Sequence, residues 1–329
     1  MELPFPTEGE GLLLHHWDTD GMSSAALLLQ AMESTEVETF TPSIGNYLID
    51  EKDQKKIRKI NPDFVIVVDM ALPKDSIDFL KDFGSVFIFD HHLQDKHDVR
   101  LHHNPVIDGA TPKEYPSATW VMTDYLDRKP DLLTILGAFG DREEKLKDND
   151  VAMETVDKVL EELDSDFEEV LKCVELLDSN YKIGEREKVT RMPRFLSGVE
   201  KPEGILSRED LQENKEKLKK AIEDEVEGSL NEVKEDVLHK EMDSPYNIIS
   251  TVARRLAWAR EDKIVIASNC NYDPDDCQIY IRGPIENSEA IIQEMKDRGY
   301  SAGGKSDVVG MVVPQEDKEE VLEDLIEML

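Results

Sequence analysis

The residues best suited to chemistry stand where apolar runs end in the first half of the chain. The segment 16–21 reads HWDTDG, Asp69 follows the run VIVV, the segment 90–92 reads DHH after the run VFIF, and Asp141 follows a further apolar segment. Seven of the eight histidines also lie within the first 103 residues. This concentration of carboxylates and imidazoles predicts a metal-binding site.

The mixture of ligand types indicates which metals would bind. Carboxylate and imidazole together suit Mn²⁺ or another first-row divalent ion better than zinc–thiolate or all-oxygen calcium chemistry. No lysine or arginine stands among the motif residues. Because four aspartates gathered without a cation would repel one another strongly, we expect two divalent ions. Such a centre predicts metal-assisted hydrolysis of a phosphate ester without a protein nucleophile.

A parallel sheet would bring these side chains together. Apolar runs that predict buried strands alternate with helical patterns, which is typical of an α/β fold whose sheet is covered on both faces. The carboxyl ends of such strands meet at one edge, so separate strands can deliver side chains to one place. The predicted strands are 11–17, 64–68 and 85–89, and the predicted helical or buried segments are 22–32, 74–83, 117–126 and 131–138.

The second half predicts a helical connector followed by a smaller α/β unit. Residues 148–227 are rich in charge but keep recurring leucines and valines, which favours helices over disorder. We expect three parts, at residues 1–184, 185–227 and 228–329. In the last part the predicted helices are 246–260 and 288–298, and the predicted strands are 263–267, 278–282 and 308–313.

Each candidate residue also has a plainer interpretation. An aspartate after a strand is commonly a helix N-cap, which would account for Asp20 and Asp69 taken singly. A histidine near a strand end is commonly a structural hydrogen-bonding residue, and we keep that interpretation for His15, His102 and His103. The joint occurrence of these groups at successive strand ends favours the metal site.

In form and order, these motifs resemble the DHH phosphoesterase superfamily, which includes RecJ-type exonucleases and nanoRNases. The resemblance rests on the segments 16–21, 90–92 and 140–141 and on Asp69, and it covers the first half of the chain. It implies catalytic roles for Asp69, His91, His92 and Asp141. It also implies two Mn²⁺ ions, one held by His16 and Asp18, the other by Asp20, His91 and Asp141, with Asp69 bridging them and His92 supporting the site or facing the substrate.

The last part of the chain resembles the DHHA1 domain that follows the catalytic domain in this superfamily. The resemblance rests on the glycine-rich segment 303–310, GGKSDVVG, and on the segment 280–282, YIR. The lysine and the pair of valines in the first segment depart from the usual pattern, which leaves the substrate preference open. The resemblance implies substrate contacts from Arg282, Gly303, Gly304, Lys305 and Ser306, across a cleft between the domains.

One motif match is misleading. The segment 299–306, GYSAGGKS, matches the phosphate-loop pattern GxxxxGK[ST] letter for letter. That loop needs a strand before it and a helix after it, whereas the predicted order here is reversed. We therefore reject an NTPase, although backbone N–H groups of a glycine-rich loop can hold a phosphate. The alternative is a simple Gly-Gly turn.

Composition limits the partners and the compartment. The formal charge of −34 repels nucleic acid unless bound divalent ions or a salty cytoplasm counter the field. A halophilic source stays an open hypothesis. No apolar run approaches the roughly 18 residues of a membrane span, and the first residues do not resemble a signal peptide. Three cysteines without metal-ligand spacing predict free thiols in a reducing, cytoplasmic compartment.

The expected function is hydrolysis of short oligonucleotides or single-stranded nucleic acid to mononucleotides. RecJ-type enzymes usually carry an additional nucleic-acid-binding domain, and no basic stripe with interleaved aromatics replaces one here. Alternatives within the same chemistry are a 3′-phosphoadenosine 5′-phosphate phosphatase and a cyclic dinucleotide phosphodiesterase. An alternative of another class is a noncatalytic Cdc45-like scaffold in a replication or repair complex, although such relatives tend to lose metal ligands.

Overall fold

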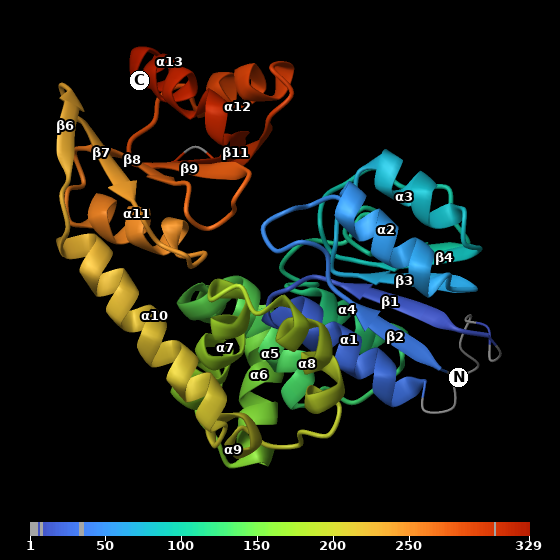
Figure 1. Ribbon diagram of the computed structural model, residues 1–329. Helices are drawn as coiled ribbons and strands as arrows, with labels where there is room; N and C mark the ends of the chain where they lie inside the picture. Colours follow the sequence, from blue (N-terminus) through green and yellow to red (C-terminus); the bar gives the residue numbers. More distant parts are fainter. Residues whose placement is uncertain (1–5, 7–8, 33–35, 306) are drawn as a thin grey trace. The chain divides into compact units, whose positions relative to one another are not determined.

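The chain folds into two compact units, shown in the computed structural model of Figure 1. The structure describes residues 6, 9–32, 36–305 and 307–329. Unit 1 comprises Met1–Tyr181 and Glu185–Glu213, and unit 2 comprises Lys182–Gly184 and Asn214–Leu329. The α/β fold class predicted for both ends of the chain is confirmed. The domain boundaries at residues 184 and 227 stay a prediction.

A five-stranded parallel sheet lies at the centre of unit 1, in the order β2-β1-β3-β4-β5. The three predicted strands are confirmed, although the first ends at His15 and not at residue 17. Every residue of β1 and β3 is buried, as expected for strands covered on both faces. The strands are β1 (Gly11–His15), β2 (Val37–Phe40), β3 (Phe64–Val68), β4 (Ser85–Phe89) and β5 (Leu101–His103).

Helices cover both faces of this sheet. Figure 1 shows α2 and α3 on one face and α1 and α4 on the other. Helix α1 also packs against α4 and α5. The segments at 117–126 and 131–138, which were predicted to be helical or buried, are both helices. The helices are α1 (Thr19–Ala31), α2 (Glu51–Ile60), α3 (Lys74–Lys81), α4 (Ala118–Tyr125) and α5 (Leu132–Arg142).

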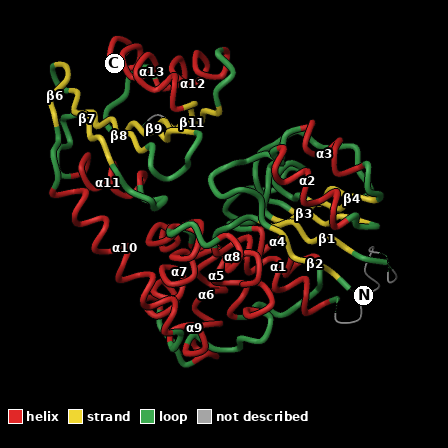
Figure 2. Tube along the Cα trace, in the orientation of Figure 1, coloured by secondary structure: helices red, strands yellow, loops and turns green. Residues whose placement is uncertain are grey.

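The charge-rich stretch after α5 is helical, as predicted, and Figure 2 shows its run of helices in red. Helices α6 to α9 bury apolar residues such as Val156 and Leu177 in the core of unit 1. Helix α10 continues from unit 1 into unit 2. The elements are η1 (Glu143–Asp148), α6 (Asp150–Leu163), α7 (Phe167–Lys182), α8 (Arg186–Leu196), α9 (Glu203–Leu206) and α10 (Glu209–Glu227).

Unit 2 is built on a six-stranded mixed sheet in the order β10-β11-β9-β8-β7-β6. Only β7 and β8 pair in parallel among these strands. Helix α11 contacts β8 and β9, and α12 contacts β10 and β11. The strands are β6 (Asn231–Lys234), β7 (Val237–Met242), β8 (Ile264–Asn269), β9 (Asp276–Arg282), β10 (Ser301–Lys305) and β11 (Val308–Pro314), and the helices are α11 (Ile249–Trp258), α12 (Ser288–Asp297), η2 (Gln315–Asp317) and α13 (Lys318–Met328).

The predicted glycine-rich loop is mostly a strand. Gly303 and Gly304 belong to β10, where they pair with Gly310 and Val309 of β11. A Cβ atom on Gly304 would lie closer than 3.0 Å to the Val308 carbonyl oxygen, so this close pairing requires glycine. Helix α12 precedes the segment and β11 follows it, which confirms the reversed order that excludes a phosphate loop.

The prediction of free thiols is wrong for two of the three cysteines. Cys270 and Cys277 form a disulfide bond between the end of β8 and β9, whereas Cys173 is a buried free thiol. Their spacing gave no signal for this pairing, because the hairpin that brings them together was not recognised. In the described part of the chain, no helix is both long and apolar enough to cross a bilayer.

Candidate metal centre

Most of the predicted site residues lie at the carboxyl edge of the unit 1 sheet. His16 and Asp18 follow β1, Asp69 follows β3, and the segment 90–92 follows β4. Asp141 lies in the last turn of helix α5, so the segment before it, predicted as helical or buried, is a helix. Helix α5 nevertheless delivers this carboxylate to the same edge, with its Oδ2 atom 3.1 Å from Nε2 of His91.

One group of potential ligand atoms comes from His16, Asp18 and Asp69. These atoms all lie within 4.8 Å of one another. His16 Nδ1 is 2.7 Å from Asp18 Oδ2 and 3.7 Å from Asp69 Oδ2. One imidazole and two carboxylates make a donor set of the kind that manganese accepts.

A second group comes from Asp20, His91 and Asp141, again with all atoms within 4.8 Å of one another. His91 Nε2 lies 3.7 Å from Asp20 Oδ2 and 3.5 Å from Asp69 Oδ1. The other oxygen of Asp69 is the one that faces His16. Asp69 therefore reaches each group with a different carboxylate oxygen.

Buried polar atoms without hydrogen bonds show that these residues fit a cation. In the described residues, both oxygens of Asp69 and Nε2 of His16 are buried and have no hydrogen-bond partner of normal geometry. Asp69 also has a φ of 58°, in the left-handed region that costs a non-glycine residue roughly 1–2 kcal/mol. Unsatisfied buried carboxylate oxygens on a strained backbone are expected where an ion supplies the missing partner.

The electrostatics point the same way. Burial and the nearby Asp141 carboxylate raise the pKa of Asp20 to about 7. Burial, Asp20 and Asp18 raise the pKa of Asp69 well above its usual range. Burial opposes a charged imidazole at His91, but Asp141 and Asp69 raise its pKa to about 12. Without a metal ion, protons are the only cations that can relieve the repulsion among these carboxylates.

Two backbone N–H groups hold Asp20 in place. Its carboxylate accepts hydrogen bonds from Ala118 N at 2.7 Å and Thr119 N at 2.9 Å, both at the start of α4. Sequence reasoning missed this support, and the only signal for it was Ser117 as an N-cap. It also missed Asp178 of α7, whose Oδ1 accepts from the backbone N and hydroxyl of Thr19 at 3.0 and 2.7 Å.

The three side chains of the segment 90–92 make different contacts. Only His91 belongs to the group with Asp20 and Asp141. Asp90 is fully buried, and its Oδ1 atom accepts from the backbone N of His91 at 2.8 Å and lies 2.8 Å from Nδ1 of His92. The His92 side chain is 46% exposed. Asp90 thus shapes the loop and holds His92 beside Asp69, and these three residues form a further group of potential ligands with His91.

Three histidines stay outside these groups, as their plainer interpretation expects. The His15 ring is buried and contacts the carbonyl oxygen of His16 at 2.7 Å. His102 accepts from the backbone N of His97 at 3.0 Å. His103 packs against Phe89 and Tyr125. None of the three is in a potential metal-ligating group among the residues that the structure describes.

The predicted substrate-binding residues lie in unit 2, where the structure gives a partial account of them. Arg282 of β9 pairs with Asp307, at 2.9 Å, so its charge is already balanced. Gly303, Gly304 and Lys305 belong to β10. Ser306 lies outside the described residues. Their binding role stays a prediction.

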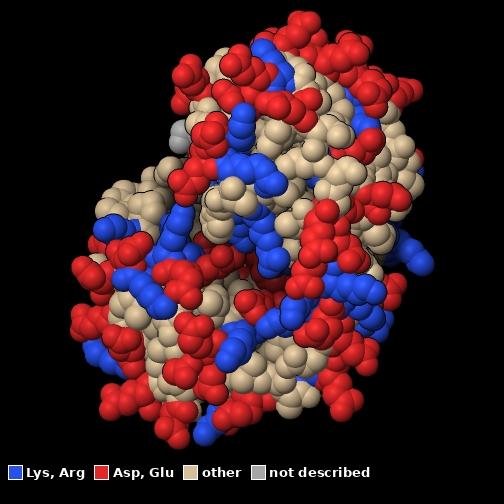
Figure 3. All heavy atoms as spheres, turned by 90° about the vertical axis from the view of Figure 1, so that its left-hand side faces the viewer, with Lys and Arg blue, Asp and Glu red and all other residues tan. Residues whose placement is uncertain are grey.

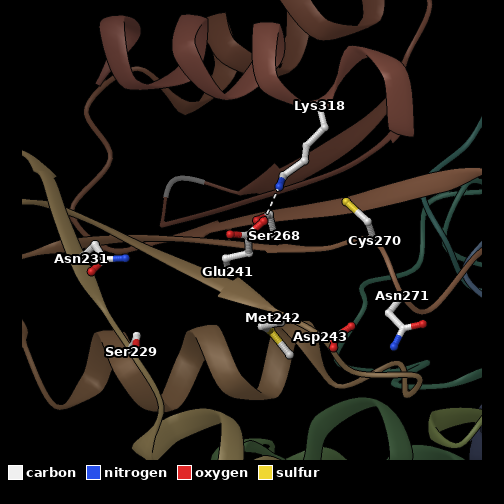
Figure 4. A pocket seen from close by; sticks show the side chains of 9 residues that line it. All are labelled: Ser229, Asn231, Glu241, Met242, Asp243, Ser268, Cys270, Asn271 and Lys318. Atoms are coloured by element: carbon white, nitrogen blue, oxygen red, sulfur yellow. Dashed lines mark hydrogen bonds and ion pairs between the residues drawn. The ribbon is translucent and has the colours of Figure 1, made fainter.

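Unit 2 also holds a polar pocket of about 630 Å³ that sequence reasoning missed. Figure 4 shows Lys318 pointing toward Glu241, with Ser268 beside the pair and Cys270 nearby. The Lys318 ammonium group lies 2.6 Å from Glu241 and 3.2 Å from Glu319. Because carboxylates already neutralise this lysine, the pocket offers a phosphate no unpaired cation.

Residues 12–149 match the model of the DHH family, N-terminal domain. This part of the chain is similar to the DHH family, and the resemblance predicted from the motifs is confirmed. No curated protein sequence matches the chain.

Three solved structures share the fold at low sequence identity. RecJ of Thermus thermophilus in complex with Mn²⁺ has a TM-score of 0.67 and 16% identity, over 96% of this chain and 51% of RecJ. The chain thus spans about half the length of that relative. The pGpG-specific phosphodiesterase PggH of Vibrio cholerae has a TM-score of 0.52 and 15% identity, over 97% and 98% of the two chains. CDC45 of Entamoeba histolytica has a TM-score of 0.51 and 10% identity, over 97% and 95%.

Gly137 of α5 offers a test of how tightly the centre is packed. A Cβ atom there would lie closer than 3.0 Å to the Asp20 carboxylate and the Thr119 hydroxyl. We expect Gly137→Ala to displace Asp20, lower the free energy of unfolding by roughly 1–3 kcal/mol and weaken Mn²⁺ binding. Gly198→Ala is the control, because its Cβ would meet only the Phe195 carbonyl oxygen at 3.7 Å. If calorimetric titration gives the same Mn²⁺ affinity for both variants, the centre is not packed as tightly as proposed.

A second test uses the raised pKa values. A carboxyl pKa of about 7 at Asp20 means that the metal-free fold loses stability as the pH rises from about 4 to 7. The raised pKa of His91 extends this loss above about pH 6.5. Divalent ions need both groups deprotonated, so Mn²⁺ should stabilise the protein more at about pH 8 than at about pH 5.5.

We expect the difference to be at least roughly 1.4 kcal/mol, or about tenfold in apparent affinity. Thermal unfolding with and without Mn²⁺ at both pH values measures it. In Asp20→Asn, which lacks the titrating carboxyl group, the Mn²⁺ increment should be smaller and should depend less on pH. An increment in the native protein that is the same at both pH values is incompatible with protons and metal competing for Asp20.

Proposed function

We propose that this protein is a phosphodiesterase that uses two divalent ions, Mn²⁺ foremost, to hydrolyse short single-stranded oligonucleotides to mononucleotides in the cytoplasm. The observation that carries the proposal is the position of Asp69, whose two buried and unsatisfied oxygens face two separate ligand groups. The match of residues 12–149 to the DHH family supports it. Residues 1–184 would be the catalytic domain, 185–227 the connector and 228–329 the substrate-binding domain.

The chain's own residues suggest how the reaction is arranged. His16, Asp18 and Asp69 would hold one ion, and Asp20, Asp69, His91 and Asp141 would hold the other. Two bound ions supply an activated water and charge stabilisation for an in-line displacement at phosphorus. Backbone N–H groups of α4 keep the Asp20 carboxylate oriented, and Asp178 holds the start of α1, the helix that carries Asp20. The Asp20 carboxylate therefore does not have to reorganise when substrate binds.

We propose that His92 moves a proton in the reaction. Burial opposes its charged form, but the Asp90 carboxylate raises the pKa of His92 above its usual value. Its Nδ1 atom lies against Asp90, which leaves Nε2 directed away from that partner. A protonated Nε2 can donate to the leaving oxygen of the cleaved ester, and this general-acid step needs no further residue.

Short substrates are favoured by the comparisons. PggH, a pGpG-specific phosphodiesterase by name, matches this chain over nearly the full length of both proteins. RecJ of Thermus thermophilus has about half of its length outside the match. A phosphatase acting on 3′-phosphoadenosine 5′-phosphate and a cyclic dinucleotide phosphodiesterase remain alternatives with the same chemistry.

A noncatalytic replication scaffold is the second candidate. The likeness to CDC45 of Entamoeba histolytica, at a TM-score of 0.51, favours it. Against it stand the filled ligand positions, since all six side chains of the predicted set converge in two groups. A scaffold has no reason to keep a strained, buried and unsatisfied aspartate such as Asp69.

Substitution of the shared carboxylate is the direct test of the site. At position 69 we choose asparagine because it tolerates the left-handed backbone better than alanine does. Asp69→Asn changes the shared carboxylate, and Asp141→Ala removes a candidate ligand on α5. Loss of a residue that only hydrogen-bonds to a metal ligand typically lowers activity by roughly 10–100-fold. We expect either change to lower kcat by more than this, while the circular dichroism spectrum stays normal. Asp108→Ala, at an exposed carboxylate paired with Lys96, is the control. Near-native turnover of either site variant refutes the assignment.

A substrate panel tests the proposed function itself. Purified protein with Mn²⁺ would receive RNA and DNA of two to ten nucleotides, 3′-phosphoadenosine 5′-phosphate and cyclic di-AMP, at low and high salt. We expect oligonucleotides to be cut to mononucleotides, and removal of divalent ions by a chelator to abolish the reaction. If no substrate is cleaved under any condition, the result favours the noncatalytic replication scaffold.

A further inference from the structure

Unpaired cations are notable in a chain whose formal charge is −34. Figure 3 shows Asp and Glu side chains spread over most of the face drawn, with smaller groups of Lys and Arg between them. In unit 1, cations gather around a cavity of about 370 Å³ beside the edge strand β2, which we call the edge cavity. Its charged lining residues are Lys56, Arg186, Arg191, Arg194, Glu38 and Glu187.

Two of these arginines have a structural role. Arg194 donates to the carbonyl oxygen of Val37 in β2. Arg186 donates to the carbonyl oxygen of Thr41 and pairs with buried Asp53 at 2.6 Å. Capping the outward carbonyl groups of an edge strand protects it from pairing with other chains.

The other two cations have no such role. Lys56 of α2 and Arg191 of α8 are exposed, and neither forms a hydrogen bond or ion pair within the part of the chain that the structure describes. Glu38 and Glu187 line the same cavity without pairing with either of them at 4.0 Å or less. Two elements thus direct unneutralised cations at one hollow, which is the arrangement that binds an anion.

One residue that lines the edge cavity contacts a sequence neighbour of the metal centre. Thr190 lines the cavity, and its backbone contacts the ring of His15, the neighbour of the metal-ligand candidate His16. Thr41 also lines it and begins the loop that carries Tyr47. The Tyr47 ring is 61% exposed and stacks on His16 with 5.8 Å between the ring centroids.

These observations together describe groups that can bind a single strand of nucleic acid. An exposed ring beside the metal centre can stack on a nucleobase, which is worth roughly 1–3 kcal/mol per base. Cations farther along can neutralise backbone phosphates. A path limited to two cations and one ring fits a few nucleotides and does not require the long basic groove of a duplex binder.

We propose that the edge cavity binds a backbone phosphate of a single-stranded oligonucleotide whose terminal phosphodiester lies at the metal centre, with Tyr47 stacked on a base between them. This proposal rests on the proposed function and refines its substrate class. Lys56 and Arg191 hold the phosphate, and substrates longer than a dinucleotide gain affinity from them.

The test compares two double variants that remove the same charge. Lys56→Gln/Arg191→Gln changes the edge cavity, and Arg100→Gln/Lys172→Gln changes two exposed cations elsewhere in unit 1. We expect the cavity variant to raise KM for a hexanucleotide about tenfold, with unchanged kcat and unchanged kinetics on a dinucleotide. The control variant should match the native protein on both substrates.

Salt dependence of hexanucleotide binding, measured by fluorescence anisotropy, gives a readout that is independent of cleavage. Each single-strand phosphate contact contributes about 0.7 to the slope of log affinity against log salt, so the cavity variant should lose roughly 0.7 to 1.4. Tyr47→Ala should weaken binding and Tyr47→Phe should restore it.

Three results would overturn the proposal. The first is a cavity variant that binds the hexanucleotide as tightly as the native protein does. The second is a native protein that does not bind the hexanucleotide at all. The third is a cavity variant that loses only inorganic phosphate binding, which would identify a free-anion site. The protein could also bind the hexanucleotide through the edge cavity and cleave no substrate. That result would support the proposed binding site and refute the proposed phosphodiesterase activity.

Discussion

The structure of unit 1 depends on one electrostatic constraint, which is that buried carboxylates are held together at the edge of a parallel sheet. Asp20 and Asp69 are almost completely inaccessible, and Asp141 lies beside them. Burial and mutual repulsion raise the pKa values of the first two, which opposes their ionisation when no metal is bound. Divalent cations remove this conflict because they balance the charge and give the buried oxygens of Asp69 a partner.

The fold holds these like charges by separate means. Strands β1, β3 and β4 end side by side, helix α5 brings Asp141 from outside the sheet, and the start of α4 donates two N–H groups to Asp20. Asp178 then ties the first turn of α1 to α7 through Thr19. These contacts hold Asp20 and the first turn of α1 in place, which is the kind of preorganisation that electrostatic stabilisation of a transition state requires.

Sequence reasoning could find the sheet and most of the site for a physical reason. Fully buried parallel strands read as unbroken apolar runs, so β1, β3 and β4 were evident, and each was followed by candidate ligand residues. The edge strands β2 and β5 are short and partly polar, and their patterns are weak. The segment before Asp141 could be predicted only as helical or buried, because α5 is apolar nearly throughout. The Cys270–Cys277 bond and the edge cavity depend on tertiary pairing that local patterns do not encode.

The most direct test of the account is the location of bound metal. Crystals grown with Mn²⁺ and measured at the manganese absorption edge would show anomalous scattering at each ion. The account predicts two peaks, one within coordination distance of His16, Asp18 and Asp69 and one within coordination distance of Asp20, His91 and Asp141, with Asp69 contacting both. A single peak, or manganese only at surface carboxylates elsewhere, would contradict it.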